Sequence, residues 1–306
     1  MYYSLNLVSQ ILACSLSSWV SVWITMEIST FSVLAMIHSV GVSTIRFSSS
    51  ASYFIIQSVA GIGALIGGVF IFDLGSETLL FKVLFVSSMM IKLGLVPTHF
   101  WVMHVFSTTP ISCLLFIMVV NKLAPLMLLN TSILLFSKPQ TVIIMSFMVF
   151  SILISSFLSL SAMSVTELLA ASSVGQSGWM VLSGIFGQPI FYLSCYAMSM
   201  VLVIMALHMK QMRLIPLLLL SLSGLPPFLL FSPKVFILLN MTINNFSFYL
   251  LFPILFSVVV SLYMYVKMSL HVYLVSKQTY PTETYSAFSL IMVSMSLIGL
   301  LVMYPF

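Results

Sequence analysis

Long apolar runs follow one another along this chain almost from end to end. A transmembrane helix needs about 20 consecutive apolar residues to cross about 30 Å of hydrocarbon, and about eleven runs of that length can be drawn here. Charged residues make up 5% of the chain, whereas a soluble domain has about 25%. A membrane barrel would show short segments of alternating polarity instead. The sequence therefore predicts an all-α polytopic membrane protein.

The predicted segments leave no room for a separate soluble domain. They span residues 3–18, 20–42, 51–72, 79–103, 110–130, 141–160, 165–184, 189–208, 214–240, 246–271 and 286–304. Their connections are short and polar, and include Arg46–Ser50, Asp73–Glu77 and Ser276–Pro281. We therefore expect about eleven transmembrane helices in a single transmembrane domain over residues 1–306.

Two of these segments contain helix breakers. The fourth is interrupted at Gly94 and Pro97, and the ninth at Gly224–Pro227 and Pro233, because proline removes a backbone donor and breaks the helix ladder. The two segments are five apart, which suggests two five-helix repeats at about 3–130 and 141–271, each with a discontinuous fourth helix. Since five is odd, the second repeat must be inverted, and paired breaks of this kind indicate a transport site near the membrane midplane. Segment 286–304, the eleventh helix, is then expected to pack peripherally.

Basic loop residues predict the orientation, because they collect on the side from which insertion starts. Four of them lie in loops that follow even-numbered segments: Arg46, Lys210, Arg213 and Lys277. Odd-numbered loops hold Lys138 and the acids Asp73 and Glu77. The N-terminus, where no removable presequence is visible, is therefore placed on the matrix or cytoplasmic side, with Phe306 opposite.

Four charged residues fall well inside the apolar segments: Glu27, Lys92, Lys122 and Lys234. Their combined cost of insertion is about 10 to 14 kcal/mol, and such residues usually face a protein interior or a water-filled cavity. Snorkelling to lipid headgroups is the alternative for Lys122 and Lys234. Three lysines that each lie a few residues from a helix break favour a functional role.

Glu27 has two interpretations. It is either an interfacial carboxylate in water or a partner that faces Lys92 and lowers the cost of both charges. A nearby anion favours the charged ammonium while burial favours the neutral amine, so a change in the distance between them would load or unload a proton. His99 either connects Lys92 with Lys122, because a neutral imidazole both donates and accepts, or is a satisfied core histidine.

No motif for chemistry on a bound substrate is visible. Cys14, Cys113 and Cys195 are far apart inside apolar runs and suggest neither a disulfide framework nor a metal site. There is no phosphate-binding glycine loop and no heme or iron–sulfur signature. The basic residues are scattered singly, so no nucleic-acid partner is expected.

Several stretches together resemble a known family of membrane subunits. They are Trp23–Ile28, Tyr53–Ser58, Met90–Trp101, Lys122–Pro125, Leu169–Ser173 with Gly178–Met180, and Ser223–Pro227 with Pro233–Lys234. In this order they are similar to the mitochondrial NADH dehydrogenase subunit 2 family, antiporter-like membrane subunits of respiratory complex I. The resemblance implies an eleven-helix subunit whose proton path carries over onto Glu27, Lys92, Lys122 and Lys234, with His99 also matching.

Three positions depart from the family pattern. Met103–His104 stands where relatives commonly have Pro-Glu, and Thr166–Glu167 where they often have two basic residues. Gln176 occupies a position at which histidine is frequent. These departures leave the central lysines intact.

The resemblance implies a function within a larger assembly. We expect a proton-translocating membrane-arm subunit of complex I, which is the H⁺-translocating NADH:ubiquinone reductase. The expected location is the mitochondrial inner membrane, with the N-terminus in the matrix and the C-terminus facing the intermembrane space. The complex is expected to use FMN, iron–sulfur clusters, NADH and ubiquinone, none of them bound by this chain. Expected partners are the other membrane-arm subunits, including neighbouring antiporter-like ones, with lipids, protons and water.

Two alternatives remain at this point. The first is a stand-alone cation/proton antiporter of related fold. The second is a purely structural assembly subunit, which the buried charges disfavour because hydrophobic isosteres often hold helices together as well.

Overall fold

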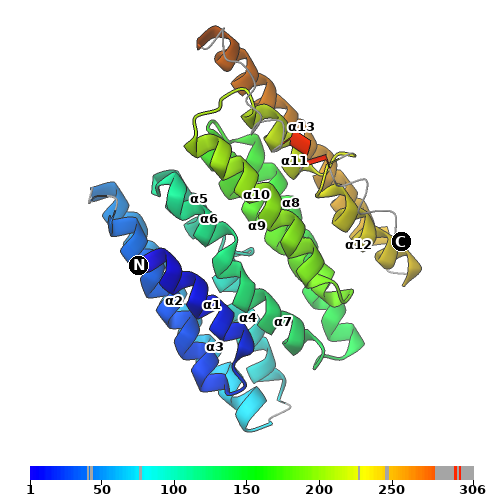
Figure 1. Cartoon of the computed structure of the whole chain (residues 1–306). Helices are drawn as coiled ribbons and strands as arrows, with labels where there is room; N and C mark the ends of the chain where they lie inside the picture. The colour runs from blue at the N-terminus through cyan, green and yellow to red at the C-terminus, as the bar shows by residue number, and fades with distance from the viewer. Residues whose placement is uncertain are drawn as a thin grey trace.

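The computed structural model describes residues 1–39, 41, 44–75, 78–226, 228–244, 248–279, 293–294 and 296–297. All regular elements within these residues are helical, and no strand occurs among them. Figure 1 shows the helices side by side in one elongated bundle, with their axes roughly parallel. The protein is therefore an all-α polytopic membrane protein, as predicted. Apart from four positions, the predicted segment 286–304 lies outside the described residues.

Each of the first ten predicted segments is a helix or a broken helix. The first half of the chain comprises α1 (Tyr2–Ser15), α2 (Trp19–Ser39), α3 (Thr44–Gly68) with the π-helical end η1 (Val69–Asp73), α4 (Leu79–Leu93), α5 (Phe100–Thr108), α6 (Ile111–Met118), the 3-10 turn η2 (Val120–Lys122) and α7 (Leu123–Ile133). The second half comprises α8 (Lys138–Leu160), α9 (Val165–Ile185), α10 (Pro189–His208), α11 (Ile215–Ser223), α12 (Phe231–Ile243) and α13 (Phe248–Thr279).

Two stretches that we expected to be polar connections are helical. Arg46–Ser50 lies in the first turns of α3, where the hydroxyls of Ser48, Ser49 and Ser50 each donate to the backbone carbonyl three residues earlier. The serine side chains thus bond to the helix itself, so their polarity does not end it. Helix α13 likewise continues through Lys277 to Thr279. No proline stands between Pro253 and Pro281 to interrupt it.

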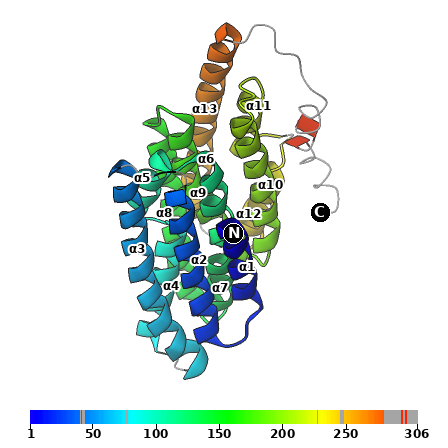
Figure 2. The ribbon, with the colours of Figure 1, turned by 60° about the vertical axis from the view of Figure 1, so that its left-hand side comes forward.

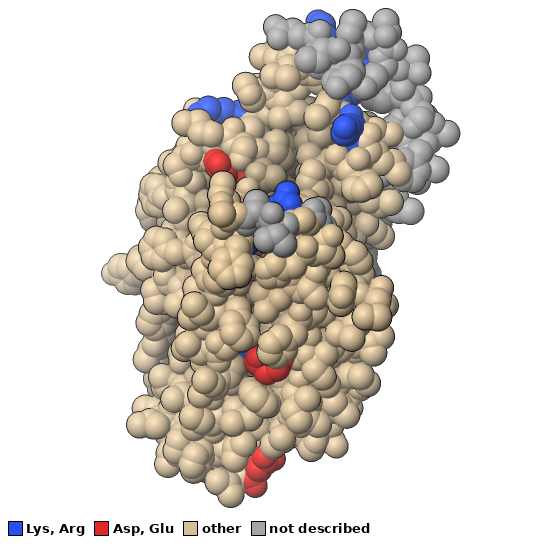
Figure 3. Space-filling view, turned by 90° about the vertical axis from the view of Figure 1, so that its left-hand side faces the viewer, with Lys and Arg blue, Asp and Glu red and all other residues tan. Residues whose placement is uncertain are grey.

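Six of the described helical stretches are long and apolar enough to cross a membrane. They are Trp19–Ser39, Thr44–Asp73, Ile111–Ile133, Lys138–Leu160, Pro189–His208 and Tyr249–Lys277. Figure 3 shows one face of the molecule, on which uncharged side chains cover almost the whole middle while the visible Lys and Arg gather toward one end. This distribution is that of a multi-pass membrane protein.

Three of the predicted segments are interrupted. The predicted breaks at Gly94 and Gly224 are both present, and both glycines adopt the left-handed backbone conformation, with φ of 71° and 80°. Only glycine visits this region at little cost. A third interruption is the 3-10 turn η2 between α6 and α7, and it carries Lys122, which we expected to lie a few residues from a helix break. Each of the three lysines predicted inside the apolar segments therefore lies at or near a point where a helix is broken.

Helix α9 occupies the middle of the bundle (Figures 1 and 2). It packs on α5, α7, α8, α10 and α12, and 16 of its 21 residues are buried. Figure 2 also shows α13 projecting beyond the other helices at one end. Helix α9 therefore contacts elements from both halves of the chain, as does α10, which packs on α6 and α7.

Candidate functional site

Glu27 and Lys92 form a buried ion pair between α2 and α4. The Lys92 Nζ lies 2.9 Å from Glu27 Oε1, and the two side chains are 3% and 16% exposed. The expected pairing of these residues is therefore present. Two groups of opposite charge that are buried together cost much less than either would alone, because each stabilises the other in a medium of low dielectric constant.

A glycine of α3 makes room for the carboxylate. A Cβ atom at Gly61 would lie 2.3 Å from Glu27 Oε1, so no larger residue fits without displacing the carboxylate. The Gly61 carbonyl also accepts a hydrogen bond of 2.8 Å from Trp23 Nε1, one turn before Glu27. Helix α3 thus holds the acidic partner of Lys92 through a close backbone approach.

The end of α4 is capped by side chains from elsewhere in the bundle. Helix α4 ends at Leu93, and the backbone N–H groups of Gly94 and Leu95 turn back to the carbonyls of Ile91 and Met90, as in a Schellman motif. The two remaining carbonyls, of Lys92 and Leu93, accept from Gln57 Nε2 of α3 at 3.4 Å and from Ser177 Oγ of α9 at 3.3 Å. The break beside Lys92 is therefore held by α3 and α9 together.

Lys122 is anchored to the central helix. Its Nζ donates to the Ser173 carbonyl at 2.7 Å and to Ser177 Oγ at 2.8 Å, and it lies 5.5 Å from the centre of the Tyr196 ring. No acidic group pairs with it among the described residues. The Lys122 ammonium is therefore stabilised by a helix carbonyl, a hydroxyl and an aromatic face.

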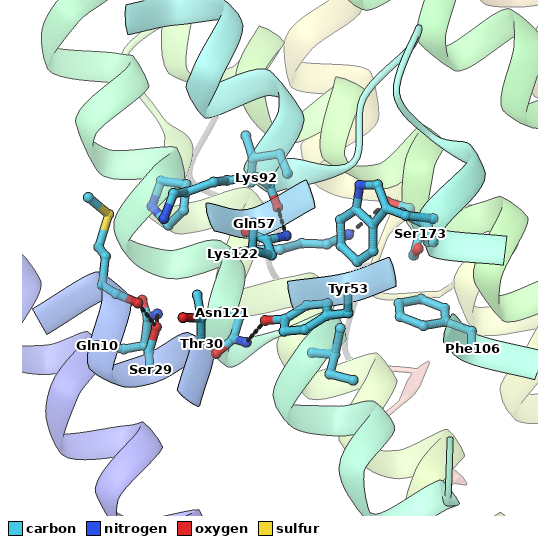
Figure 4. A pocket seen from close by; sticks show the side chains of 16 residues that line it. Gln10, Ser29, Thr30, Tyr53, Gln57, Lys92, Phe106, Asn121, Lys122 and Ser173 are labelled. Atoms are coloured by element: carbon cyan, nitrogen blue, oxygen red, sulfur yellow. Dashed lines mark hydrogen bonds between the residues drawn. The ribbon is translucent and has the colours of Figure 1, made fainter. Parts of the chain in front are cut away.

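Lys92 and Lys122 line one polar cavity (Figure 4). The cavity leaves about 20 Å³ for the centres of water molecules, which is room for about one water. Its other polar lining residues are Gln10, Ser29, Thr30, Tyr53, Gln57, Asn121 and Ser173. Sequence reasoning did not single out these amides and hydroxyls as site residues. Their helical spacing is the sequence feature that could have identified them: Tyr53 and Gln57, for example, lie one turn apart on α3.

His99 lies apart from this cavity. It is buried before the first turn of α5, its ring is 4.2 Å from that of Phe100, and its Nδ1 has no hydrogen-bond partner among the described atoms. The lining of the cavity that Lys92 and Lys122 share does not include it. The suggested role of His99 as a bridge between the two lysines stays a prediction.

Lys234 lies on the far side of α9 at a second cavity. Its side chain passes over Gly224, where a Cβ atom would be 2.9 Å from Lys234 Nζ, and the Nζ donates to the Ser223 carbonyl at 2.9 Å. That carbonyl ends α11, so the cation lies at the negative end of a helix dipole. The Trp179 ring of α9 faces the ammonium, with its centre 5.9 Å away.

Two departures from the family pattern have local explanations. Gln176 lines the cavity of Lys234, accepts a hydrogen bond from the Tyr192 hydroxyl and donates to the Leu222 carbonyl at 3.3 Å. Glu167 forms a capping box with Ser164 at the start of α9. Gln176 thus lines the second cavity, whereas Glu167 caps the N-terminus of α9 and lines neither cavity.

The described residues contain no group of three or more His, Cys, Asp or Glu side chains able to hold a metal ion. The arrangement consists of one ion pair, two further buried lysines, and small polar cavities on either side of α9. Such an arrangement offers groups that can take up, hold and release protons inside a membrane protein.

Comparison with known proteins agrees with this class of site. The profile of the family described as NADH:quinone oxidoreductase/Mrp antiporter, transmembrane, matches residues 17–214. The NADH-ubiquinone oxidoreductase chain 2 of Albinaria caerulea is 30% identical over 270 residues, which covers 88% of this chain and 87% of the relative. The chain therefore belongs to the NADH-ubiquinone oxidoreductase chain 2 group within the NADH:quinone oxidoreductase/Mrp antiporter family.

Solved structures share the fold. A chain of respiratory complex I from Thermus thermophilus, determined with bound aureothin, has a TM-score of 0.80 at 22% identity, covering 98% of this chain and 78% of the other. A chain of the membrane-bound sulfane sulfur reductase, an archaeal respiratory membrane complex, has a TM-score of 0.84 at 17% identity, covering 99% and 72%. At these identities the likeness concerns the fold alone.

Proposed function

We propose that this chain is a proton-translocating membrane-arm subunit of respiratory complex I in the mitochondrial inner membrane. Protons move through it while NADH oxidation and ubiquinone reduction take place elsewhere in the complex. One observation carries the proposal: the Glu27–Lys92 ion pair joins a polar cavity that Lys122 also lines.

The ion pair is the element that can switch. Glu27 lies 2.9 Å from Lys92, and separation of the two partners starts the transfer of a proton into the cavity. Lys122 lines the same cavity and takes up the proton next. From there the proton passes α9 to Lys234 and out of the protein, so Glu27, Lys92, Lys122 and Lys234 act in sequence, with His99 as an auxiliary group.

The proposed architecture is two inverted five-helix repeats followed by a peripheral eleventh helix. Neighbouring helices support it, because several contacts in one half have a counterpart in the other. The contacts of α1 with α2 and α7 correspond to those of α8 with α9 and α13. The contacts of α3 with α2 and α4 correspond to those of α10 with α9 and α11. The contact of α4 with α7 corresponds to that of α11 with α13. The N-terminus lies in the matrix and the C-terminus faces the intermembrane space.

The chain works as one component of the H⁺-translocating NADH:ubiquinone reductase. Its partners are the other membrane-arm subunits, including neighbouring antiporter-like ones, and its ligands are protons and water within a lipid surround. FMN, the iron–sulfur clusters, NADH and ubiquinone bind to other subunits.

The Lys92→Met variant tests the proposal. We expect the assembled complex to keep oxidising NADH while proton pumping in proteoliposomes is abolished or strongly reduced. Lys138→Met is the matched control, because Lys138 is an exposed lysine at the start of α8 and its loss leaves the path intact. Pumping by Lys92→Met equal to that of the control would refute the assignment.

Loss of one ionic partner also affects stability. Removing one member of a buried pair costs about 3 to 5 kcal/mol, because the other charge is left uncompensated. The double variant Glu27→Gln with Lys92→Met removes both charges and is expected to be more stable than Lys92→Met without restoring pumping. Recovery of both stability and pumping would favour a purely structural role, whereas ion-dependent transport by the isolated chain would favour a stand-alone antiporter.

A further inference from the structure

A pocket opens near the end of the bundle from which α13 projects (Figure 2). It has a volume of about 430 Å³ and lies between the residues just after α8 and the outer turns of α13. Its lining combines two basic residues, Lys267 and His271, with apolar ones such as Met163, Leu270 and Leu274. A ligand with an apolar body and an anionic end fits this composition.

The two basic side chains lie where the headgroups of a bilayer begin. Lys267 lies 19 residues after Phe248, the first residue of α13, and a helix rises about 1.5 Å per residue, so about 28 Å separates them along the axis. The hydrocarbon core of a bilayer is about 30 Å thick. When Phe248 lies at one boundary of this core, Lys267 lies at the other and His271 one turn further out. The pocket is therefore at the depth of lipid headgroups.

Below the pocket, the face of α13 that carries Lys267 is apolar and exposed. Tyr263, Val259, Phe256 and Phe252 precede Lys267 at intervals of three or four residues, and they are between 46% and 73% exposed. Residues at this spacing lie on one face of a helix. An acyl chain that hangs from a headgroup in the pocket would lie along this face. Pocket and face together match the two parts of a phospholipid.

The charge of the pocket favours an anionic headgroup. No acid is among the described residues that line it, and none of the described acids pairs with Lys267 or His271. Glu167 bonds to the pocket residue Met163, but its carboxylate accepts from the backbone N–H groups of Met163 and Ser164. It also lies at the positive end of the α9 dipole, which compensates its charge. The basic side chains are thus available to donate to a phosphate.

We propose that this pocket binds an anionic phospholipid of the membrane leaflet at this end of the molecule. The phosphate lies between Lys267 and His271, and an acyl chain lies along the exposed face of α13. The site shares no residue with the cavities of Lys92, Lys122 and Lys234. The inference therefore goes beyond the proposed function and does not depend on it.

Photolabelling of the assembled complex in lipid nanodiscs tests the site. The probes are phosphatidylglycerol and phosphatidylcholine with the same diazirine-bearing acyl chain, and labelled peptides of α13 are quantified by mass spectrometry. At equal mole fraction, phosphatidylglycerol is expected to label α13 about fivefold more, because one basic residue near the membrane surface favours an anionic lipid by about this factor. Equal labelling by the two lipids would overturn the inference. Labelling by neither would show that a partner subunit covers this face, and would overturn it too.

A double variant tests the two basic residues. Lys267→Met with His271→Gln is expected to lose the preference for phosphatidylglycerol. Lys277→Met is the matched control, because Lys277 is an exposed lysine of the same helix that does not line the pocket. It lies about 15 Å further out along the axis, so the preference is expected to stay. The same preference in both variants, or its loss in both, would contradict a site built by Lys267 and His271.

A pocket-filling variant replaces the double variant where that one fails to assemble. Leu270→Trp leaves the charge unchanged and is expected to lower labelling by phosphatidylglycerol to the level of phosphatidylcholine. Ile45→Trp, at a position of α3 that is 63% exposed, is expected to leave labelling unchanged, and equal labelling of the two variants would refute the site. Excess inorganic phosphate is expected to leave labelling intact. Displacement by phosphate would assign the pocket to free phosphate and overturn the choice of a lipid.

Discussion

At the scale of single residues, the three buried lysines are stabilised in three different ways. Lys92 has a carboxylate partner, Lys122 is bound by a carbonyl and a hydroxyl of α9, and Lys234 is folded back onto the last carbonyl of α11. Only the first arrangement neutralises the charge. The other two lysines lie against dipoles and aromatic faces, so in the proposed mechanism they exchange a proton without separating an ion pair.

Gly224→Ala tests the position of Lys234. A Cβ atom there would lie 2.9 Å from Lys234 Nζ, and the φ of 80° is unfavourable for alanine by about 1 to 2 kcal/mol. Gly187→Ala is the matched control, because its φ is 82° and nothing lies within 4 Å of the new Cβ. We expect similar losses of thermal stability in both variants but lower proton pumping only in Gly224→Ala. Equal pumping would show that the contact with Lys234 is unimportant.

At the scale of elements, the short helix α1 supports the interruption that carries Lys122. Gln10 Oε1 accepts from the backbone N–H of Ala124 at 3.2 Å, a first-turn donor of α7 without a helical partner. Asn6 Nδ2 donates to Asn121 Oδ1 at 2.9 Å, and Asn121 in turn donates to the Tyr53 hydroxyl at 3.2 Å. Helix α1 thus supplies the amides that hold the broken α6–α7 segment in place.

Gln10→Met is predicted to loosen this support. Methionine fills a similar volume but cannot accept from Ala124, and an unsatisfied buried donor costs about 1 to 3 kcal/mol. We expect lower thermal stability of the assembled complex, measured by its unfolding temperature, together with reduced pumping. Ile11→Met places the same side chain at an exposed position of α1 and is expected to change neither. If both variants behave alike, α1 does not support the interruption.

At the scale of the whole molecule, α9 separates two small polar cavities. Ser173 of α9 lines the cavity of Lys92 and Lys122, while Gln176 and Trp179 line that of Lys234. In the proposed mechanism, a proton therefore passes across α9 from one half to the other in steps.

The orientation of the chain is testable by labelling at its two ends. Met209 and Leu134 are exposed residues of loops that follow an even-numbered and an odd-numbered segment. We expect Met209→Cys to react with a membrane-impermeant thiol reagent only in inverted inner-membrane vesicles, and Leu134→Cys only in mitoplasts. The exposed Cys14 is replaced by serine in both variants. The reverse pattern would place the N-terminus in the intermembrane space.

Local features of the sequence predicted much of the fold. The lengths of the apolar runs predicted the ten segments that the structure describes. Glycine and proline residues predicted the breaks near Lys92 and Lys234. A helix break near Lys122 was expected too, but its supports, Gln10 and Asn6, were not, because they are more than a hundred residues away in the chain. Polar connections were overestimated at Arg46–Ser50 because serine can bond to its own helix.

The sequence by itself determined that this is a helical membrane protein, which of its charges lie inside the membrane, and where two of its helices break. These properties depend on the hydrophobicity and backbone preferences of residues that are close in the chain. Only the tertiary structure decided that Lys92 pairs with Glu27 beside Gly61, that Lys122 shares its cavity, and that Lys234 lies across α9 in a cavity of its own. Those relations depend on which helices become neighbours, and helix packing is set by contacts between residues far apart in the sequence.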